Sequence, residues 1–335
     1  MSETVLVTGG TGLTGANVCH QLVERGDHVR ALVRGASDAE PLTAIGVEVV
    51  EGDITQYDDV VRAAQGCDAA IHTAALLGGA SQDLNDFIAV NVHGTTHVLD
   101  AAEKVGMRRV VALSTSTFFD TTAGLPLDDA PLMTAPTDDP YTVTKLAAYN
   151  EVMERAARGQ DVVSGHPGAI YGPSPVVSRA LHRTSFNTLL LAGLRNRVGG
   201  YLRIPAVWVL GIDVARGSVA ALDKGVRGDR YILDGRPEDI TTIAEACNQV
   251  CAIAGLPHHV EDIDPSDDPE IVKRFGPTMI EIAKKAARAQ PGSKDRGPSR
   301  AERVLDYRPL SFTEGLTQTV AWFRAIGKLD PVVEG

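Results

Sequence analysis

Short apolar runs rich in β-branched residues alternate with amphipathic stretches along residues 1–173. The apolar runs predict strands, and the stretches with apolar residues three and four apart predict helices. The expected strands are residues 5–7, 29–33, 47–51, 69–73, 110–114 and 162–166, and the expected helices are 13–25, 58–64, 85–105 and 141–157. Because continuous apolar runs are typical of strands buried on both faces, the alternation predicts an α/β fold with a Rossmann-type, doubly wound parallel sheet.

The pattern becomes irregular after residue 173. One more strand is expected at 231–233, and further helices at 241–254, from 276 onward and at 312–326. We expect residues 1–173, joined by 205–235, to form the larger domain, and 174–204 with 236–335 to form a smaller C-terminal substrate-binding subdomain. This subdomain would close over the C-terminal edge of the sheet, where open α/β sheets bind ligands. Its apolar residues would line a pocket or form a core: Phe186, Leu189, Leu190, Leu191 and Trp208.

Composition narrows the class of protein. A chain of 335 residues with 44% hydrophobic content is long enough for one large α/β domain and a smaller cap. The formal net charge of −11 argues against nucleic acid or an anionic membrane as a partner. No apolar run reaches the roughly 18–20 residues of a membrane span, and no charged-then-apolar leader precedes the first strand. We expect a cytoplasmic protein with reduced, buried thiols at Cys19, Cys67, Cys247 and Cys251.

Three glycines at a spacing of three follow the first strand directly and precede the first helix. Gly9 allows a tight turn, Gly12 lets backbone amides approach a pyrophosphate, and Gly15 lets the helix pack against the strand. The N-terminus of the helix adds partial positive charge. This arrangement predicts a dinucleotide site whose contacts are Gly9, Thr11, Gly12, Leu13, Thr14 and Gly15.

The tip of the second strand distinguishes the two nicotinamide cofactors. An acidic residue there would accept hydrogen bonds from a ribose hydroxyl, whereas an arginine would pair with a 2′-phosphate. The sequence places Arg34 at the tip, with Ser37 close behind it. We therefore predict NADP as the cofactor, with NAD as the alternative if Arg34 is only a solvated surface charge.

The next two strand ends offer further cofactor contacts. Asp53 follows the third strand, where its carboxylate would accept from the adenine amino group while Ile54 packs on the ring; alternatively, Asp53 is a helix N-cap. Thr73, Ala74 and Ala75 end the fourth strand, where small residues let a cofactor lie close.

Tyr141 and Lys145 stand four residues apart at the start of an expected helix, so they share one helix face. A neighbouring ammonium stabilises a phenolate and lowers the pKa of the tyrosine. Such a tyrosine can give or take a proton at a carbonyl or hydroxyl oxygen, and the lysine can hold the nicotinamide ribose. The spacing alone is common, but its position after the glycine loop predicts an active site that moves a hydride to or from an oxygen-bearing carbon.

A hydroxyl at the same sheet edge would polarise the substrate oxygen. Ser114, Thr115, Ser116 and Thr117 follow the strand at 110–114. We expect one of these hydroxyls to act on the substrate and the others to satisfy the loop.

With these residues in place, the chain resembles the extended short-chain dehydrogenase/reductases, the NAD-dependent epimerase/dehydratase superfamily. The resemblance covers essentially the whole length, and its motifs are residues 8–15, 52–54, 72–75, 91–95, 114–115, 141–145, 166–173, 301–309, 314–316 and Trp322. Residues 31–34 look most similar to the dihydroflavonol-reductase-like and 3β-hydroxysteroid-dehydrogenase-like branches, which are carbonyl reductases and alcohol dehydrogenases.

The resemblance implies roles for individual residues. It places the substrate-polarising hydroxyl on Thr115, with Ser116 as second choice, and puts the backbone from Pro167 to Ile170 against the nicotinamide amide. It also implies a homodimer formed through the helices at 85–105 and 141–157. The chain departs from the pattern at His166, where many relatives have Arg, and at Pro41, where many reductases carry a second cation.

Three functions compete. The leading hypothesis is an oxidoreductase that interconverts a ketone or aldehyde and an alcohol, with Tyr141 as acid/base, Lys145 tuning it and Thr115 polarising the substrate oxygen. The second is a nucleotide-sugar epimerase with tightly bound NAD, which needs cations for a diphosphate; candidates are Arg179, His182, Arg183, Arg195, Arg197 and Arg203. The third is a non-catalytic NADP-sensing protein, although such relatives typically lose the tyrosine or the lysine.

Overall fold

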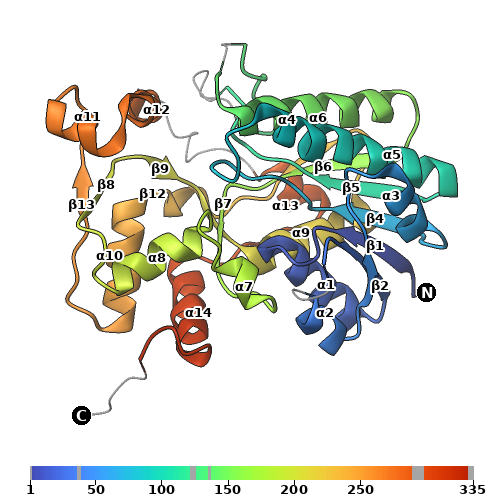
Figure 1. The fold of residues 1–335 in the computed structure, drawn as a ribbon, viewed down its shortest axis with the longest axis horizontal. Coiled ribbons are helices and arrows are strands. Elements are labelled where there is room, and N and C mark those ends of the chain that lie inside the picture. The colour runs from blue at the N-terminus through green and yellow to red at the C-terminus, as the bar shows by residue number, and fades with distance from the viewer. Residues whose placement is uncertain (1, 36–38, 121–125, 135–136, 289–297, 331–335) are drawn as a thin grey trace.

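The computed structural model describes residues 2–35, 39–120, 126–134, 137–288 and 298–330. Within these ranges the chain forms a larger lobe built on a parallel sheet and a smaller lobe of helices and short strands beside it (Figure 1).

The larger lobe contains a seven-stranded sheet in the order β11-β6-β5-β4-β1-β2-β3. Its strands are β1 (Thr4–Thr8), β2 (His28–Val33), β3 (Glu48–Glu51), β4 (Ala69–His72), β5 (Arg109–Leu113), β6 (Val162–His166) and β11 (Arg230–Ile232). Every adjacent pair is parallel, which confirms the predicted Rossmann-type sheet. The strand order reverses at β1 and β4, the position at which such sheets bind ligands.

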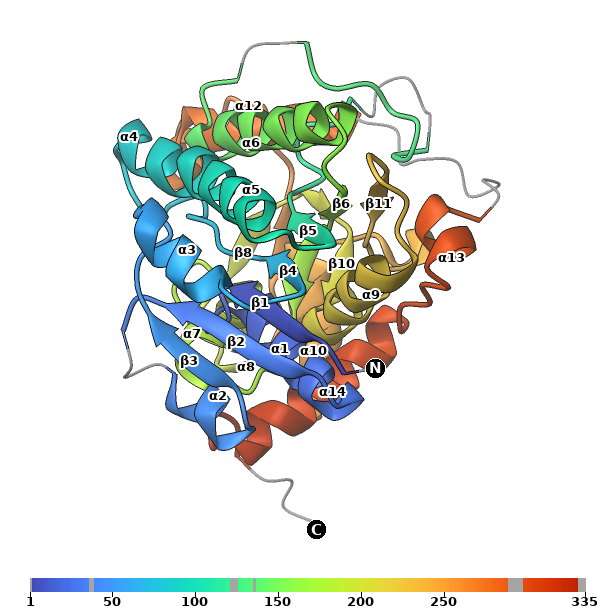
Figure 2. The same cartoon turned by 90° about the vertical axis from the view of Figure 1, so that its right-hand side faces the viewer.

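Helices cover both faces of the sheet (Figure 2). One layer consists of α3 (Tyr57–Ala64), α5 (Gly94–Val105) and α6 (Pro140–Ala157), and the other of α1 (Leu13–Arg25), α2 (Glu40–Ala44) and α9 (Gly211–Lys224). Because strand side chains alternate, Leu6 packs into the first layer while Val5 and Val7 pack into the second. Full burial of each such side chain contributes about 1.5–3 kcal/mol, so the two apolar layers hold the sheet in place.

One predicted helix is interrupted. The sequence predicts a continuous helix at 85–105, but the structure has α4 (Leu84–Phe87), a π-helical segment (Ile88–His93) and then α5. Asn91 in the π segment is buried, and its side chain accepts from the Leu76 amide at 2.7 Å and donates to Thr144 Oγ1 at 3.1 Å. The interruption turns this amide inward, where it ties the loop after β4 to α6.

The smaller lobe has its own core. Its elements are β7 (Ala169–Tyr171), α7 (Val177–Ala180), α8 (Phe186–Leu194), β8 (Gly200–Leu202), β9 (Pro205–Ala206), β10 (Trp208–Leu210), a 3-10 turn (Pro237–Asp239), β12 (Thr241–Thr242), α10 (Ile243–Ala254), β13 (Glu261–Ile263), α11 (Pro269–Phe275), α12 (Pro277–Arg288) and α14 (Phe312–Ala325). Trp208 is buried, stacks on Phe312 with ring centroids 5.4 Å apart and donates from Nε1 to the Thr241 carbonyl. Phe186, Leu190 and Leu191 pack in the same cluster, so these apolar residues form a core.

The remaining helix, α13 (Arg300–Val304), lies outside this core. Ala301, Leu305 and Tyr307 pack into the apolar layer of the larger lobe with α1 and α9. The C-terminal segment therefore returns to the sheet before it enters α14.

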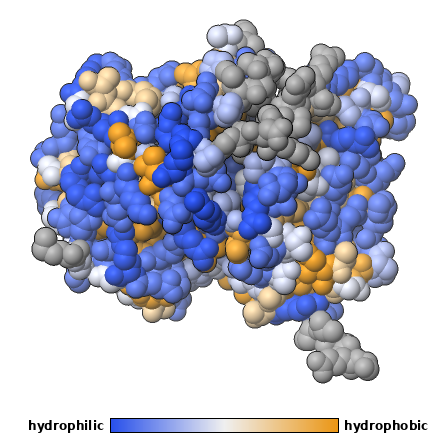
Figure 3. All heavy atoms as spheres, turned by 180° about the vertical axis from the view of Figure 1, so that it is seen from behind, coloured by the Kyte–Doolittle hydropathy of each residue, from blue (hydrophilic) through white to orange (hydrophobic). Residues whose placement is uncertain are grey.

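The exterior of the molecule is predominantly hydrophilic on the face opposite that of Figure 1, with apolar residues in separate patches (Figure 3). Among the described residues, no helix combines the length and apolarity needed to cross a membrane. The four cysteines are buried with free thiols, and burial raises the pKa of Cys19 and of Cys247 to about 12. These thiols are therefore protonated and unreactive at neutral pH.

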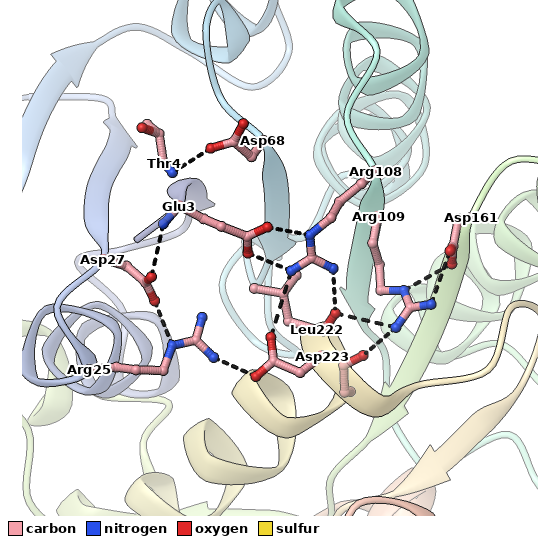
Figure 4. Close-up of polar contacts among 11 residues, drawn as sticks. Glu3, Thr4, Arg25, Asp27, Asp68, Arg108, Arg109, Asp161, Leu222 and Asp223 are labelled. Carbon is pink, nitrogen blue, oxygen red and sulfur yellow. Dashed lines mark hydrogen bonds and ion pairs between the residues drawn. The ribbon is translucent and has the colours of Figure 1, made fainter. Parts of the chain in front are cut away.

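Charged side chains join the strands at the N-terminal edge of the sheet (Figure 4). Arg108, just before β5, donates two hydrogen bonds of 2.5 Å to Glu3, just before β1. Arg109 forms a bidentate pair with Asp161, just before β6, at 2.9 and 3.0 Å. Arg25 at the end of α1 completes the group by bonding Asp223 at 2.6 Å. At this edge, the arginines and carboxylates therefore neutralise one another.

Candidate active site

The glycine loop lies at the opposite, C-terminal edge of the sheet, between β1 and α1. Gly9 has φ of +74°, and a Cβ there would lie 2.6 Å from the Ala74 amide nitrogen. A Cβ on Gly15 would lie 2.1 Å from the Gly9 carbonyl oxygen, which is far inside contact distance. Only glycine fits at both positions, so the loop is pressed against the residues that follow β4.

The first turn of α1 presents backbone amides at this edge. Its N-cap is Gly12, whose backbone is extended, and within the described ranges no side chain caps it. The N-terminal amides and the helix dipole together suit an anionic ligand. The glycine cradle and the uncapped helix start fit the pyrophosphate of a dinucleotide, with Thr11, Leu13 and Thr14 half-buried around them.

The predicted adenosine contacts lie along the same edge. Arg34 is exposed at the tip of β2, while Ser37 lies outside the described residues. Asp53 is half-buried, and its Oδ1 accepts from the Thr55 amide at 2.8 Å and the Thr55 hydroxyl at 2.9 Å. The N-cap of α3 is Gln56, so Asp53 does not cap that helix.

Two of the residues predicted to contact the cofactor also contact other parts of the protein. Ile54 is buried against α5, where a Cβ on Gly94 would lie 3.2 Å from its side chain. Thr73 Oγ1 donates to the Thr8 carbonyl at 2.8 Å, which fixes the end of β4 beside β1. Ala74 and Ala75 follow, half-buried, next to the glycine loop.

The first turn of α6 carries the tyrosine and the lysine. The helix starts at Pro140, and the Asp139 carboxylate caps it by accepting from the Thr142 amide at 2.9 Å. Lys145 is 3% exposed, and its Nζ donates to the Leu113 carbonyl at the end of β5 at 2.8 Å. Tyr141 is half-buried, and the Thr115 side chain lies close enough to its hydroxyl to lower the pKa of that group. The structure thus brings Thr115, Tyr141 and Lys145 together.

Burial dominates the protonation of this cluster. It raises the pKa of Tyr141 to about 12, with the negative Asp139 adding to the rise and the Thr115 hydrogen bond opposing it. Burial also lowers the pKa of Lys145 to about 8. The net shift of the Tyr141 pKa is upward, whereas the sequence predicts a lowered pKa, because burial outweighs the other effects and the Lys145 ammonium is directed at the Leu113 carbonyl.

Among the four candidate hydroxyls, Thr115 is the one whose side chain acts on the pKa of Tyr141. Its backbone is fixed from behind, because Nδ1 of the buried His166 donates to the Thr115 carbonyl at 2.8 Å. The His166 ring packs against Phe119 and Tyr149, and burial lowers its pKa to about 3, which keeps it neutral. A neutral ring that donates one hydrogen bond replaces the arginine of many relatives.

The segment after β6 completes the edge. Pro167 is buried directly after the strand, and Ile170 is half-buried in β7 and packs against the core of the larger lobe. A second histidine, His72, bridges Thr8 Oγ1 at 2.7 Å and Thr95 Oγ1 at 3.0 Å, and burial lowers its pKa to about 3. The pattern of the sequence gave no reason to single out this bridge, which joins β1, β4 and α5.

Several of the cations proposed for a diphosphate are engaged by protein groups. Arg203 pairs with Asp262 and Asp264, each at 3.0 Å. Arg195 donates to the Lys328 carbonyl at 3.0 Å, and Arg183 to the Gly79 carbonyl at 2.7 Å. The charge of Arg203 is therefore already balanced by carboxylates.

Comparison with known proteins agrees with the geometry. A sequence model of the NAD dependent epimerase/dehydratase family matches residues 5–234. The chain is 30% identical to sterol demethylase protein B of Methylococcus capsulatus, over 97% of this chain and 100% of that protein. It is 32% identical to a putative dihydroflavonol 4-reductase of Synechocystis, over 70% of this chain and 68% of that protein.

A solved structure shares the fold. UDP-glucose 4-epimerase of Thermotoga maritima matches with a TM-score of 0.74 at 18% identity, over 96% of this chain and 99% of that one. At this identity the likeness describes the fold alone. The sheet, the glycine loop and the family match together place this chain in the NAD dependent epimerase/dehydratase family, to which it belongs.

Proposed function

We propose that this protein is an NAD(P)-dependent oxidoreductase that interconverts a ketone or aldehyde and the corresponding alcohol. The observation that carries the proposal is the cluster of Thr115, the half-buried Tyr141 and the buried Lys145 at the same edge of the sheet as the glycine loop. The nicotinamide, when bound, supplies or accepts the hydride at the substrate carbon.

Each of the three side chains has a distinct task. Thr115 donates a hydrogen bond to the substrate oxygen, which polarises the carbonyl. Tyr141 gives its proton to that oxygen in reduction and takes it back in oxidation. Lys145 holds a positive charge in a buried site, where it stabilises the Tyr141 phenolate far more than it would in water. Because burial raises the pKa of Tyr141 to about 12, this stabilisation is required for the oxidative direction.

Arg34 supports NADP as the preferred cofactor. Its guanidinium is exposed at the tip of β2, near the cradle, where it would pair with a 2′-phosphate. NAD is the alternative, and would be held by the same glycine cradle and the same Asp53 carboxylate.

The nucleotide-sugar epimerase alternative has weaker support. It requires free cations in the smaller lobe for a diphosphate, and Arg203 is paired with two carboxylates. The epimerase neighbour is 18% identical, whereas the relative described as a dihydroflavonol 4-reductase is 32% identical. A non-catalytic, cofactor-sensing role has no support from the site, since Tyr141 and Lys145 are both present.

A panel assay tests the proposal. Parent protein is supplied with NADPH or NADH and a set of aromatic and alicyclic ketones and aldehydes, and absorbance at the reduced-cofactor band is followed. We expect oxidation of NADPH with at least one carbonyl compound. Interconversion of UDP-glucose and UDP-galactose with no net cofactor consumption, and no carbonyl reduction, would support the epimerase instead.

A further inference from the structure

A small cavity lies beside Lys145, between the sheet and the helix layer to which α5 and α6 belong. The space open to the centre of a water molecule is about 10 Å³, which is room for one water. Strands β4, β5 and β6 form one wall, and α5 and α6 form the other. The polar groups that line it include Ser114, Ser164 and Lys145, with His72 and Thr95 beside them. A cavity with such a lining suits a polar molecule.

The two serines present buried hydroxyl groups on the same face of the sheet. Strand side chains alternate between the faces, and Val110 and Val162 pack into the apolar layer under α5 and α6. Ser114 and Ser164 stand at even spacings from these valines, so they point to that layer. The Ser164 residue is 1% exposed, and within the described ranges neither serine oxygen has a hydrogen-bond partner. Buried hydroxyl groups are almost always paired, so two such oxygens at one cavity indicate a bound molecule.

The ammonium of Lys145 is the third polar group at the cavity. Of its three N–H donors, one bonds the Leu113 carbonyl at 2.8 Å, and the nicotinamide ribose of a bound cofactor would take a second. Burial is the sole cause that acts on the pKa of Lys145, so among the described residues no carboxylate balances this charge. A buried charge needs hydrogen bonds on every side, and the third N–H requires an acceptor.

We propose that Ser114 and Ser164 hold one water molecule in this cavity, and that the water accepts a hydrogen bond from Lys145 and keeps the ammonium charged beside Tyr141. The water accepts from Nζ and donates its two hydrogens to the two serine oxygens, and three hydrogen bonds are typical of buried water. The proposal rests on the proposed function for the task of Lys145. Ser114 and Ser164 are then positioning residues, which act on the reaction through Lys145.

The titratable groups around the ammonium leave its own titration distinct. His72 from β4 and His166 from β6 feel the charge of Lys145, and burial lowers the pKa of each ring to about 3. Tyr141 and Tyr149 lie on α6 itself, and burial raises the pKa of Tyr141 to about 12. Thr95, which lines the cavity from α5, is uncharged. A loss of activity near pH 8 is therefore assigned to Lys145, whose pKa burial lowers to about 8.

Crystallography of the parent tests the site directly. At a resolution that shows ordered solvent, we expect one water within hydrogen-bond distance of Ser114 Oγ, Ser164 Oγ and Lys145 Nζ. A cavity without an ordered water would overturn the proposal. This measurement does not depend on turnover, so it decides whether the water site exists even if the proposed function fails.

Ser164→Val tests what the water does for Lys145. Valine is favoured in strands, and its two methyl groups would take the space of the hydroxyl and of the water. We measure kcat/KM for carbonyl reduction from about pH 6 to pH 10. Activity should fall as the pH rises through the pKa of Lys145, because a neutral lysine does not stabilise the Tyr141 phenolate. Without the water the ammonium loses an acceptor, so this fall should move about one pH unit towards acid.

Two further variants separate this effect from a structural defect. Ser164→Ala removes one hydroxyl but leaves room for the water, so the fall in activity should move in the same direction by a smaller amount. Ser218→Ala is the matched control, because Ser218 is also a fully buried serine, but its hydroxyl bonds the Val214 carbonyl within α9 at 2.7 Å. Its pH profile should match that of the parent. Thermal melts confirm that each variant is folded, and Ser164→Ala carries the test if Ser164→Val does not fold.

The outcomes distinguish the water site from the function on which it rests. An active parent whose folded Ser164 variants keep the parental pH profile would overturn the role of the water and leave the oxidoreductase intact. Lower activity with an unmoved profile would also overturn it, because a structural defect alone gives that result, as would an equal shift in Ser218→Ala. A parent that reduces no carbonyl compound would overturn the proposed function instead.

Discussion

The two edges of the sheet are built from different chemistry. At the N-terminal edge, Arg25, Arg108 and Arg109 are each paired with a carboxylate that precedes a strand or ends a helix (Figure 4). At the C-terminal edge stand a glycine cradle, an uncapped helix start, a row of hydroxyls and the buried ammonium of Lys145.

The difference shows which edge of the sheet has polar groups available to a ligand. Charges at the N-terminal edge satisfy one another, so they hold the strands together and leave little for a ligand. Lys145 has three N–H donors, and among the described residues its one hydrogen-bond acceptor is the Leu113 carbonyl. Substitutions at the C-terminal edge should therefore change activity, and substitutions at the N-terminal edge should change stability.

Loss of the phenol hydroxyl should have the largest effect. Tyr141→Phe removes the proton donor while keeping the ring, so kcat should fall about 10²–10⁴-fold. The melting temperature should stay near that of the parent. Steady-state kinetics with the best carbonyl substrate and a thermal melt check both parts, and parental activity in the variant would remove Tyr141 from the mechanism.

Lys145→Met should abolish activity but stabilise the fold at neutral pH. Burial lowers the pKa of Lys145 from 10.5 to about 8, so folding below pH 8 must bury a charge. The variant buries no charge, which stabilises the folded state, but it also loses the hydrogen bond to the Leu113 carbonyl. The net effect should make the variant roughly 1–2 kcal/mol more stable than the parent at pH 7.

The difference in stability between the Lys145→Met variant and the parent should depend on pH. The unfolded state binds more protons than the folded state between about pH 8 and 10.5, so parental stability rises with pH in this window and the gap closes. Urea unfolding at pH 7, 9 and 10.5 measures it. A gap that stays constant with pH would mean that Lys145 is not the titrating group.

At the other edge, Arg109→Met should destabilise the protein by about 1–2 kcal/mol with kcat unchanged. The Arg109 side chain is 12% exposed and its pair with Asp161 joins β5 to β6. The matched control is Arg158→Met, whose pair with Glu154 is 67% and 55% exposed and should contribute under about 0.5 kcal/mol. Urea midpoints measure both, and equal midpoints would contradict the role given to this edge.

An effect confined to one of the two cofactors should come from Arg34→Ala. Removing one solvent-exposed guanidinium from a 2′-phosphate should weaken NADPH binding about tenfold and leave NADH binding unchanged. Fluorescence titration of both cofactors gives the ratio. An equal change for the two cofactors would show that Arg34 does not read the phosphate.

Local signals made the larger lobe predictable from sequence. The periodicity of apolar runs predicted the parallel sheet, and the glycine spacing predicted the cradle, because both depend on residues that are neighbours in the chain. The helix at 85–105 was predicted as continuous, since nothing in its own pattern reveals that Asn91 bonds Leu76 and Thr144. The direction of the Tyr141 pKa shift was missed for the same reason, because packing sets burial.

The smaller lobe offered fewer local signals. Whether Trp208 lined a pocket or a core depended on a carbonyl of β12 and on the ring of Phe312. Whether Arg203 was free depended on carboxylates at 262 and 264, far along the chain. These contacts join residues far apart in the chain, so the local sequence pattern could not predict which residues form them.

The most direct test of the central claim follows the hydride itself. NADPH deuterated at C4 of the nicotinamide, prepared as each of the two stereoisomers, is incubated with the parent and its best ketone, and the product is examined by mass spectrometry. We predict one deuterium on the carbinol carbon per cofactor oxidised, from one stereoisomer only. Product without deuterium from both stereoisomers, or turnover without net oxidation of the cofactor, would contradict the account.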